Sequence, residues 1–194
     1  MRVIAGQYRS RRLASLPGMD LRPTSDRLRE TLFNVLTAGN PSALVGTTWV
    51  DLFAGTGAVG IEALSRGAGQ VYFVDVSRQA TQLIAKNLAG LQTSSGADIL
   101  TLTAVQALQQ LGGQCIRADF VFLDPPYRKT EAYRDTLEAL ASTQIVTPAT
   151  VVIAEHERKF DPGDWFGALT RYRKLKQGDA VLSFYQAAAT PCGP

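Results

Sequence analysis

The sequence has few of the residues that metal and redox sites use. Its 194 residues include one histidine and two cysteines, Cys115 and Cys192, which lie far apart in the chain. Zinc ribbons, CxxC redox sites and disulfide frameworks need several such residues at short spacing. We therefore expect no metal and a reducing compartment. His156, between two glutamates, is expected to be structural rather than a metal ligand.

Long apolar runs are also missing from the sequence. A helix that spans a bilayer needs about 20 consecutive apolar residues, and Met1 is followed by Arg2 and a mixed segment rather than by the apolar stretch of a secretory signal. We expect a cytoplasmic protein without a membrane partner. With 45% hydrophobic residues, 194 residues suffice for one domain with a substantial core.

Basic residues are concentrated at the N-terminus. The net charge is only +3, but the first 30 residues hold seven arginines against three acidic residues. Such a segment is typical of contacts with nucleic-acid phosphates, although a solvated charged arm would have the same composition. A non-catalytic RNA-binding module would account for this arm and for nothing else in the chain.

The chain is expected to have three parts. Residues 1–40 predict a basic arm with a short hairpin, followed by an amphipathic helix that begins near Ser25. Residues 41–186 alternate apolar strand runs with helical stretches, which is typical of a parallel sheet covered by helices on both faces. Residues 187–194 are small and rich in proline and glycine, and we expect a disordered tail.

Seven strands and four further helices are expected in the second part. The last two strands are separated by four turn-forming residues, which predicts an antiparallel hairpin. The strands are expected at 47–53, 70–75, 99–103, 120–124, 150–154, 172–176 and 181–186, and the helices near 58–66, 77–90, 104–111 and 131–142.

The first chemical motif is a glycine loop between an expected strand and helix. Residues 51–60 have the sequence DLFAGTGAVG, in which Gly55, Gly57 and Gly60 satisfy the pattern G-x-G-x-x-G. Glycines let the backbone approach a ligand at the carboxyl ends of parallel strands. A tight strand-to-helix turn without a ligand is the alternative, so the loop alone does not identify a cofactor.

Two acidic residues near the loop bear on the choice of ligand. Asp51 would repel a pyrophosphate, but it suits the ammonium group of a ligand such as S-adenosylmethionine. Asp75 ends the next strand, where it would meet the ribose hydroxyls of S-adenosylmethionine or of a dinucleotide. An NAD-dependent oxidoreductase therefore stays open, although it leaves Asp51 without a role.

The second motif is Asp-Pro-Pro-Tyr at residues 124–127, directly after an apolar run. Pro125 and Pro126 restrict the backbone and so fix the directions of its carbonyl groups. The Asp124 carboxylate and the Pro125 carbonyl would accept both hydrogens of an exocyclic amine, and Tyr127 would stack on the base. An ordinary turn is the alternative, but in one parallel sheet the motif would share an edge with the glycine loop, which favours catalysis.

Together, these motifs resemble a known family. The glycine loop with Asp-Pro-Pro-Tyr is similar to the class I S-adenosylmethionine-dependent amino-methyltransferases. With the segments 2–6, 22–27, 61–68 and 178–179, the chain resembles the RsmD family of bacterial 16S rRNA guanine-N2 methyltransferases up to about residue 186. The resemblance implies a Rossmann-like α/β fold with a seven-stranded, mostly parallel sheet, an antiparallel C-terminal hairpin and a small N-terminal hairpin and helix extension.

The resemblance also implies an activity. S-adenosylmethionine would give a methyl group to N2 of a guanine in 16S ribosomal RNA, leaving S-adenosylhomocysteine. The partner would be ribosomal RNA or the small-subunit particle, and a monomer is expected. Adenine N6 is the alternative target, because Asp-Pro-Pro-Tyr serves both chemistries.

The family's site residues map onto three sets in this chain. The catalytic residues would be Asp124, Pro125, Pro126 and Tyr127. The cofactor-binding residues would be Arg22, Thr24, Asp51, Phe53, Ala54, Gly55, Thr56, Gly57, Gly60, Asp75, Val76, Thr103 and Ala104. The RNA-binding residues would be Arg2, Arg9, Arg11, Arg12, Arg27, Arg128 and Lys129.

Overall fold

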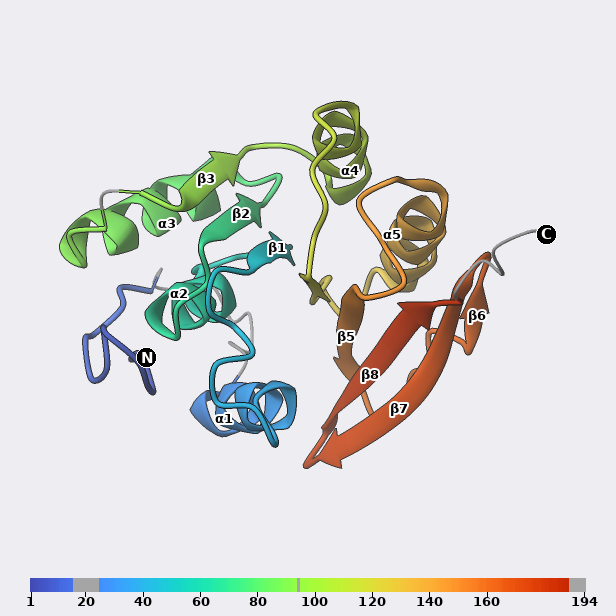
Figure 1. The fold of residues 1–194 in the computed structure, drawn as a ribbon, viewed down its shortest axis with the longest axis horizontal. Coiled ribbons are helices and arrows are strands. Elements are labelled where there is room, and N and C mark those ends of the chain that lie inside the picture. Colours follow the sequence, from blue (N-terminus) through green and yellow to red (C-terminus); the bar gives the residue numbers. More distant parts are fainter. Residues whose placement is uncertain (16–24, 94, 189–194) are drawn as a thin grey trace. The chain divides into compact units, whose positions relative to one another are not determined.

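The structure, a computed structural model, describes residues 1–15, 25–93 and 95–188 (Figure 1). The chain forms two compact units, unit 1 with Met1–Ala104 and unit 2 with Val105–Pro194. The described residues contain five helices and eight strands. This confirms the predicted alternation of strands and helices and adds one short strand. No helix among the described residues is long and apolar enough to cross a membrane.

Unit 1 contains a parallel sheet with the strand order β3-β2-β1. Strands β1 and β2 are mostly buried and carry apolar side chains such as Leu52 and Phe73, whereas β3 at the edge has no buried residue. Helix α2 packs against β1 and β2, and α3 packs against β2 and β3 (Figure 1). The bounds are β1 Thr48–Leu52, α2 Ala58–Ser65, β2 Gln70–Val74, α3 Arg78–Gly90 and β3 Ala97–Leu100.

Strand β3 differs from its predicted range of 99–103. It ends at Leu100, opposite Val74, which is the last residue of β2. The alternating apolar pattern continues through Thr103, but a strand can pair only as far as its neighbour extends. The residues after Leu100 therefore form the loop that leads to α4.

Helix α1, Asp26–Leu36, begins where the sequence predicted. The Ser25 hydroxyl caps it by accepting a hydrogen bond from the Leu28 amide at 3.1 Å. Its buried face includes Phe33, whose ring stacks on Trp49 of β1 with 5.4 Å between centroids. The helix is therefore fixed to unit 1 by its apolar face.

The N-terminal residues 1–15 fold back onto unit 1. An antiparallel bridge between Arg2 and Arg12 forms the expected hairpin, and Val3 and Leu13 are buried. The close approach to α2 depends on Gly6, because a Cβ at this position would lie 1.7 Å from the Ser65 carbonyl oxygen.

Glu62 of α2 holds this N-terminal segment. Its fully buried carboxylate accepts hydrogen bonds from the amides of Ile4 and Ala5, at 2.8 and 3.0 Å, and from Arg66 Nε at 2.8 Å. Arg29 is also fully buried, with its Nε 3.7 Å from Glu62 Oε2. Two buried charges therefore face each other where α1, α2 and the N-terminal segment meet.

Unit 2 has the strand order β4-β5-β8-β7-β6. Strands β4 and β5 are parallel, and β8, β7 and β6 continue the sheet antiparallel, which confirms the C-terminal hairpin. The two-residue strand β6 was not predicted because it is too short to show a period. The bounds are α4 Ala104–Gly113, β4 Phe120–Leu123, α5 Thr130–Ser142, β5 Val151–Glu157, β6 Trp165–Phe166, β7 Leu169–Gln177 and β8 Ala180–Ala187.

His156 has the structural role that the sequence predicted. It is buried in β5, its Nδ1 lies 2.9 Å from the Glu157 carbonyl oxygen, and its Nε2 lies 2.9 Å from Ser183 Oγ of β8. A carbonyl only accepts, so Nδ1 carries the proton and Nε2 accepts from the hydroxyl. Burial lowers the pKa of His156, which favours this neutral form.

Some predictions concern residues outside those described. They include the cofactor contacts of Arg22 and Thr24, the position of Cys192 and most of the predicted tail. Ala188, the last described residue, donates its amide hydrogen to the Ala168 carbonyl at 3.0 Å.

Replacing Glu62 by glutamine should loosen the N-terminal segment. Glutamine keeps the shape but removes the charge that offsets the buried Arg29, and breaking a buried ion pair typically costs about 3–5 kcal/mol. We expect a lower free energy of unfolding in denaturant titrations and faster tryptic cleavage within residues 9–12. Glu30→Gln, at an exposed position of α1, is the control. Equal cleavage of Glu62→Gln and the unchanged protein would contradict this role.

Candidate functional site

The glycine loop makes a sharp turn between β1 and α2 in unit 1. Phe53, Gly55 and Gly57 have positive φ values of 64°, 55° and 76°. Gly57 is the N-cap of α2 and adopts the left-handed conformation. Positive φ is uncommon for a bulky residue such as Phe53, and such backbone outliers cluster at functional sites.

The three glycines of the loop meet different demands. A Cβ on Gly60 would lie 2.4 Å from the Phe73 ring, and a Cβ on Gly57 would lie 3.1 Å from Ile84. These two glycines permit close packing of α2 within unit 1. A Cβ on Gly55 would instead meet a single atom within 4 Å, the Phe53 carbonyl oxygen at 3.9 Å. Gly55 therefore faces open space, where a ligand has room to approach the backbone.

Asp51 braces the loop from within the protein. Asp51 is only 1% exposed, and its Oδ2 accepts the Gly60 amide hydrogen at 2.9 Å. Burial raises the pKa of Asp51 to about 7, and the hydrogen bond from Gly60 opposes that rise. The predicted contact with an ammonium group stays a prediction, and the structure adds a bond that joins β1 to the first turn of α2.

Asp75 braces the same loop from the end of β2. Its Oδ2 accepts the Gly55 amide hydrogen at 2.9 Å, and its Oδ1 accepts the Ser77 amide hydrogen at 2.8 Å. A carboxylate has about four acceptor positions, and the side chain is only half-buried. Asp75 therefore keeps acceptor capacity for the predicted ribose hydroxyls.

The other described cofactor residues lie at the same ends of the three parallel strands. Ala54 is buried, and its amide hydrogen bonds the Val74 carbonyl at 2.9 Å. Val76 is 66% exposed after β2, and Thr103 is exposed before Ala104, the first residue of α4. Because parallel strands share a direction, the loops after β1, β2 and β3 meet at one edge of this sheet, where α/β proteins bind ligands.

Asn87 is a residue of this region that the sequence analysis missed. It is buried in α3, and its Nδ2 donates to the carbonyls of Thr56 and Ala14, at 3.0 and 3.2 Å. Its Oδ1 accepts the Ala14 amide hydrogen at 2.8 Å. Asn87 thus connects the glycine loop to the N-terminal segment. A polar residue on the apolar stripe of α3 was the available signal.

The Asp-Pro-Pro-Tyr motif follows β4 in unit 2. All four residues of β4 are buried, whereas Asp124 and Tyr127 are half-buried and Pro126 is exposed. The Pro126 carbonyl accepts the Lys129 amide hydrogen at 2.7 Å, which closes a turn before α5. The chain therefore leaves the core at the carboxyl end of β4, and Asp124 and Tyr127 are partly exposed to solvent.

Tyr133 of α5 supports this turn, and sequence reasoning missed it as well. Its fully buried hydroxyl lies 2.9 Å from the Glu155 carbonyl oxygen and 3.3 Å from the Pro125 carbonyl oxygen. Burial, together with the charge of Asp124, raises the pKa of Tyr133 far above its usual value, so the hydroxyl stays a neutral donor. In the sequence, Tyr133 is indistinguishable from any core aromatic residue of an amphipathic helix.

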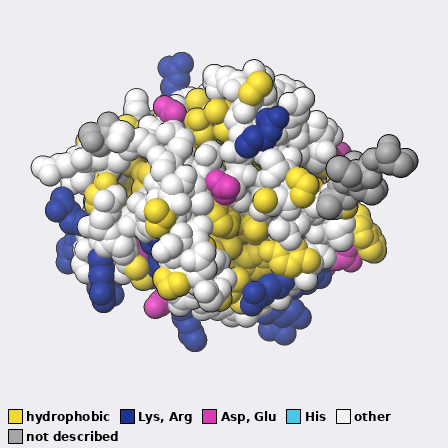
Figure 2. Space-filling view, in the orientation of Figure 1, with side chains coloured by type: hydrophobic (Ala, Val, Ile, Leu, Met, Phe, Trp, Pro, Cys, Tyr) yellow, Lys and Arg dark blue, Asp and Glu magenta, His cyan; other side chains and the backbone are white. Residues whose placement is uncertain are grey.

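The predicted RNA-binding residues are all on the surface. Arg2, Arg9 and Arg12 are exposed in the N-terminal hairpin, where Lys and Arg side chains gather on the left of Figure 2. Arg11 is exposed too, and its Nη2 donates to the Gly90 carbonyl at 2.8 Å, which attaches the hairpin to α3. Arg27 is exposed on α1, and Arg128 and Lys129 are exposed in unit 2.

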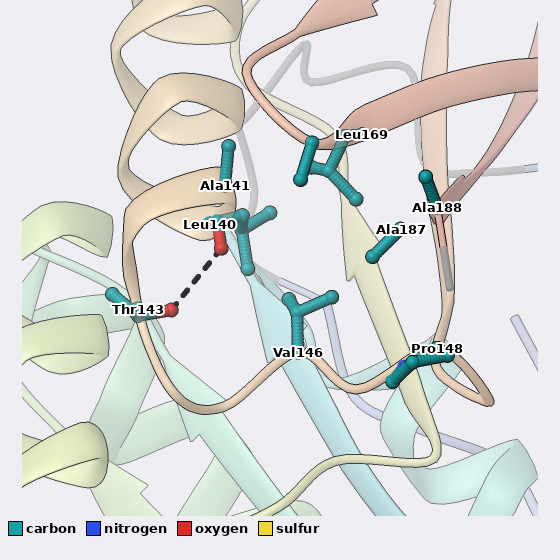
Figure 3. A pocket seen from close by; sticks show the side chains of 9 residues that line it. Leu140, Ala141, Thr143, Val146, Pro148, Leu169, Ala187 and Ala188 are labelled. Carbon is teal, nitrogen blue, oxygen red and sulfur yellow. Dashed lines mark hydrogen bonds between the residues drawn. The ribbon is translucent and has the colours of Figure 1, made fainter. Parts of the chain in front are cut away.

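A cavity of about 160 Å³ in unit 2 does not have the chemistry of a cofactor site. It lies between the end of α5, the start of β7 and the end of β8, and apolar side chains such as Leu140, Val146 and Leu169 line it (Figure 3). The Thr143 hydroxyl already donates to the Leu140 carbonyl at 3.3 Å. Ligand sites need several convergent polar groups, which this lining lacks.

Asp51→Asn should change the pH dependence of stability. The pKa of about 7 exceeds the ordinary 3.8, so between these values the folded chain holds a proton that the unfolded chain releases. Raising the pH through this window therefore removes stability. Asparagine can still accept the Gly60 amide hydrogen but cannot ionise.

The measurement is the free energy of unfolding at about pH 5 and about pH 8. The unchanged protein should lose about 1–4 kcal/mol more than Asp51→Asn between these values. Asp135→Asn, at an exposed position of α5, is the control and should behave like the unchanged protein. Identical pH profiles for Asp51→Asn and the unchanged protein would refute the buried, protonated state of Asp51.

Comparison with known proteins found a matching family profile and similar sequences. The sequence profile described as "Conserved hypothetical protein 95" matches residues 1–186. The "Ribosomal RNA small subunit methyltransferase D" of Escherichia coli strain K12 is 33% identical over 193 residues, which cover 97% of this chain and 91% of that protein. The protein of the same name from Haemophilus influenzae is 34% identical, over 85% of this chain and 84% of its own length.

A solved structure has the same fold. The Escherichia coli protein yhhF superposes with a TM-score of 0.81 and 30% identity, covering 98% of this chain and 99% of that one. This confirms the Rossmann-like methyltransferase fold that the motifs implied. The chain therefore belongs to the family described as Conserved hypothetical protein 95, the RsmD family of ribosomal RNA methyltransferases.

Proposed function

We propose that this protein transfers a methyl group from S-adenosylmethionine to the exocyclic N2 amine of a guanine in 16S ribosomal RNA. The observation that carries the proposal is the Asp-Pro-Pro-Tyr turn, in which Asp124 offers a partly exposed carboxylate and Tyr133 holds the Pro125 carbonyl. The turn has no role in an NAD-dependent oxidoreductase. The names of the relatives support ribosomal RNA as the substrate.

The residues of unit 1 suit S-adenosylmethionine. Bound there, it would supply a methyl group on a positively charged sulfur, and that methyl carbon is open to attack by an amine nitrogen. Gly55 leaves open space above the loop, and Asp75 keeps acceptor capacity for ribose hydroxyls. An ammonium group near Asp51 would favour its ionised form and so lower the pKa that burial raises.

The residues of unit 2 suit a planar amine. The lone pair of an aromatic amine is delocalised into the ring, which makes the nitrogen a weak nucleophile. Accepting one N–H at Asp124 and the other at the Pro125 carbonyl would localise that lone pair on the nitrogen. Tyr133 is closer to the Glu155 carbonyl than to that of Pro125, so the Pro125 oxygen keeps an acceptor position.

The proposed reaction requires no side chain of the protein to form a covalent bond with the substrate. Direct transfer needs orientation and electrostatic support, with no covalent enzyme intermediate. The methylated amine carries an extra proton, which the Asp124 carboxylate would accept and pass to water. With S-adenosylmethionine bound, the nitrogen's lone pair would form the new bond to the methyl carbon as the bond between carbon and sulfur breaks, so that S-adenosylhomocysteine would be left.

The RNA contacts divide into two kinds. A base must leave its stack to reach such a pocket, at a cost of a few kcal/mol. Stacking on Tyr127 would recover about 1–3 kcal/mol of that cost. The exposed arginines of the hairpin would bind phosphates without regard to sequence.

The remaining assignments extend this proposal. Residues 1–40 would serve as the RNA-binding extension and 41–186 as the methyltransferase domain. We assign the enzyme to the cytoplasm as a monomer that works without a metal, with ribosomal RNA or the small-subunit particle as its substrate. Adenine N6 is the competing target, and the identity of the methylated nucleoside separates the two.

Asp124→Ala should abolish methyl transfer while leaving the cofactor bound. The substitution removes the acceptor for one amine hydrogen but changes no residue of unit 1. Transfer of labelled methyl groups to small-subunit RNA should fall by roughly 10²–10³-fold. The affinity for S-adenosylmethionine, measured by calorimetry, should be unchanged. Asp135→Ala, on an exposed face of α5, should keep full activity. Turnover near the normal rate in Asp124→Ala would overturn the assignment.

A further inference from the structure

Two exposed aromatic side chains share one face of the C-terminal strands. Trp165 of β6 is 73% exposed, and Tyr172 of β7 is 53% exposed. Trp165 lies opposite Thr170, which pairs with Gln186 of β8. The Tyr172 ring lies beside Phe184, two residues before Gln186, so Trp165 and Tyr172 lie on the same face of the sheet. Diagonal cross-strand neighbours are about 7–8 Å apart, within reach of aromatic rings.

A β-bulge places an arginine beside these rings. Arg171 pairs with Tyr185, but Arg173 pairs with the adjacent Phe184, so Tyr172 is the extra residue of the bulge. The Tyr172 ring centroid lies 6.3 Å from that of Phe184, and the Arg173 guanidinium carbon lies 5.8 Å from the same ring. Tyr172 and Arg173 therefore both pack over the buried Phe184 ring, and both are exposed to solvent. We call Trp165, Tyr172 and Arg173 the bulge surface.

Two other basic side chains of β7 form ion pairs. Arg171 forms ion pairs with Asp161 and Asp164, and Lys174 pairs with Asp161. The hydrogen bond from Arg171 lowers the pKa of Asp161, which keeps that acid ionised in its pair. Among the described residues, Arg173 takes part in no ion pair. Its charge faces solvent beside the two rings, and Lys and Arg side chains are visible over the lower part of β7 in Figure 2.

The bulge surface suits RNA better than a second copy of this chain. A specific dimer buries about 800 Å² on each partner. In the described part of unit 2, the exposed large hydrophobic residues are only Trp165 and Tyr172. Unpaired bases stack on one or two aromatic rings, and arginine adds a phosphate contact or a stacked guanidinium plane. Exposed rings next to an available arginine match that chemistry.

We infer that the bulge surface binds unpaired nucleotides of the RNA substrate outside the methylated base. This inference rests on the proposed function and adds a second contact in unit 2. Strands β7 and β6 are three and four places from β4 in the strand order, so the surface lies roughly 15–20 Å from the strand that precedes Asp124, at about 4.8 Å per strand. The RNA thus contacts unit 2 at the target base and again several nucleotides away.

The first test measures RNA affinity. The double variant Trp165→Ala with Tyr172→Ala should bind small-subunit RNA about 5- to 100-fold more weakly, because stacking is lost. Arg173→Gln should weaken binding and flatten its salt dependence. Val45→Ala and Arg134→Gln, at exposed positions elsewhere, are the size and charge controls and should bind normally. All variants should unfold at the same denaturant midpoint as the unchanged protein, which shows that they are folded.

The second test uses tryptophan fluorescence. The chain has two tryptophans, and Trp49 is fully buried. RNA should therefore change the emission of the unchanged protein through Trp165, and Trp165→Phe should lose that change. If the unchanged protein methylates RNA, but RNA does not change its emission and the variants bind RNA normally, this inference fails alone. A dimer that the double variant dissociates without loss of RNA affinity would also overturn it. If the unchanged protein methylates no RNA, the proposed function itself fails.

Discussion

Two carboxylates, the buried Asp51 and the half-buried Asp75, hold the glycine loop in shape, and the packing of α2 and the N-terminal segment in unit 1 depends on them. Asp51 bonds the Gly60 amide and Asp75 bonds the Gly55 amide, so the ends of β1 and β2 hold the turn from both sides. This arrangement orients α2, and α2 in turn carries Glu62, which binds the N-terminal segment. The predicted cofactor loop and the basic hairpin are therefore parts of one packed structure.

Unit 2 uses a different support for its motif. The Asp-Pro-Pro-Tyr turn has few backbone amides to anchor it, since proline has no N–H. The buried hydroxyl of Tyr133 instead reaches backbone carbonyls at the motif and at β5. In both units the residues assigned to chemistry are held by buried polar groups with satisfied hydrogen bonds. This is the rigidity that catalysis by orientation requires.

The sequence predicted the elements better than it predicted their supports. Short apolar runs in the sequence predicted the alternation of buried strands and helices. The glycine loop and the Asp-Pro-Pro-Tyr motif were recognisable from their residue types. Strand β3 was misplaced because pairing with β2, not propensity, sets its end. Asn87 and Tyr133 were missed because they act on backbone carbonyls that the fold brings near. The burial of Asp51 was missed because a sequence pattern does not report solvent access.

Methylation of a guanine amine determines the chemical identity of the product, so the product is what should be measured. Small-subunit RNA or particles from cells that lack this enzyme should be incubated with the protein and S-adenosylmethionine, digested to nucleosides and separated. We expect one new methylated nucleoside, N2-methylguanosine. Formation of N6-methyladenosine, or of no methylated nucleoside, would contradict it.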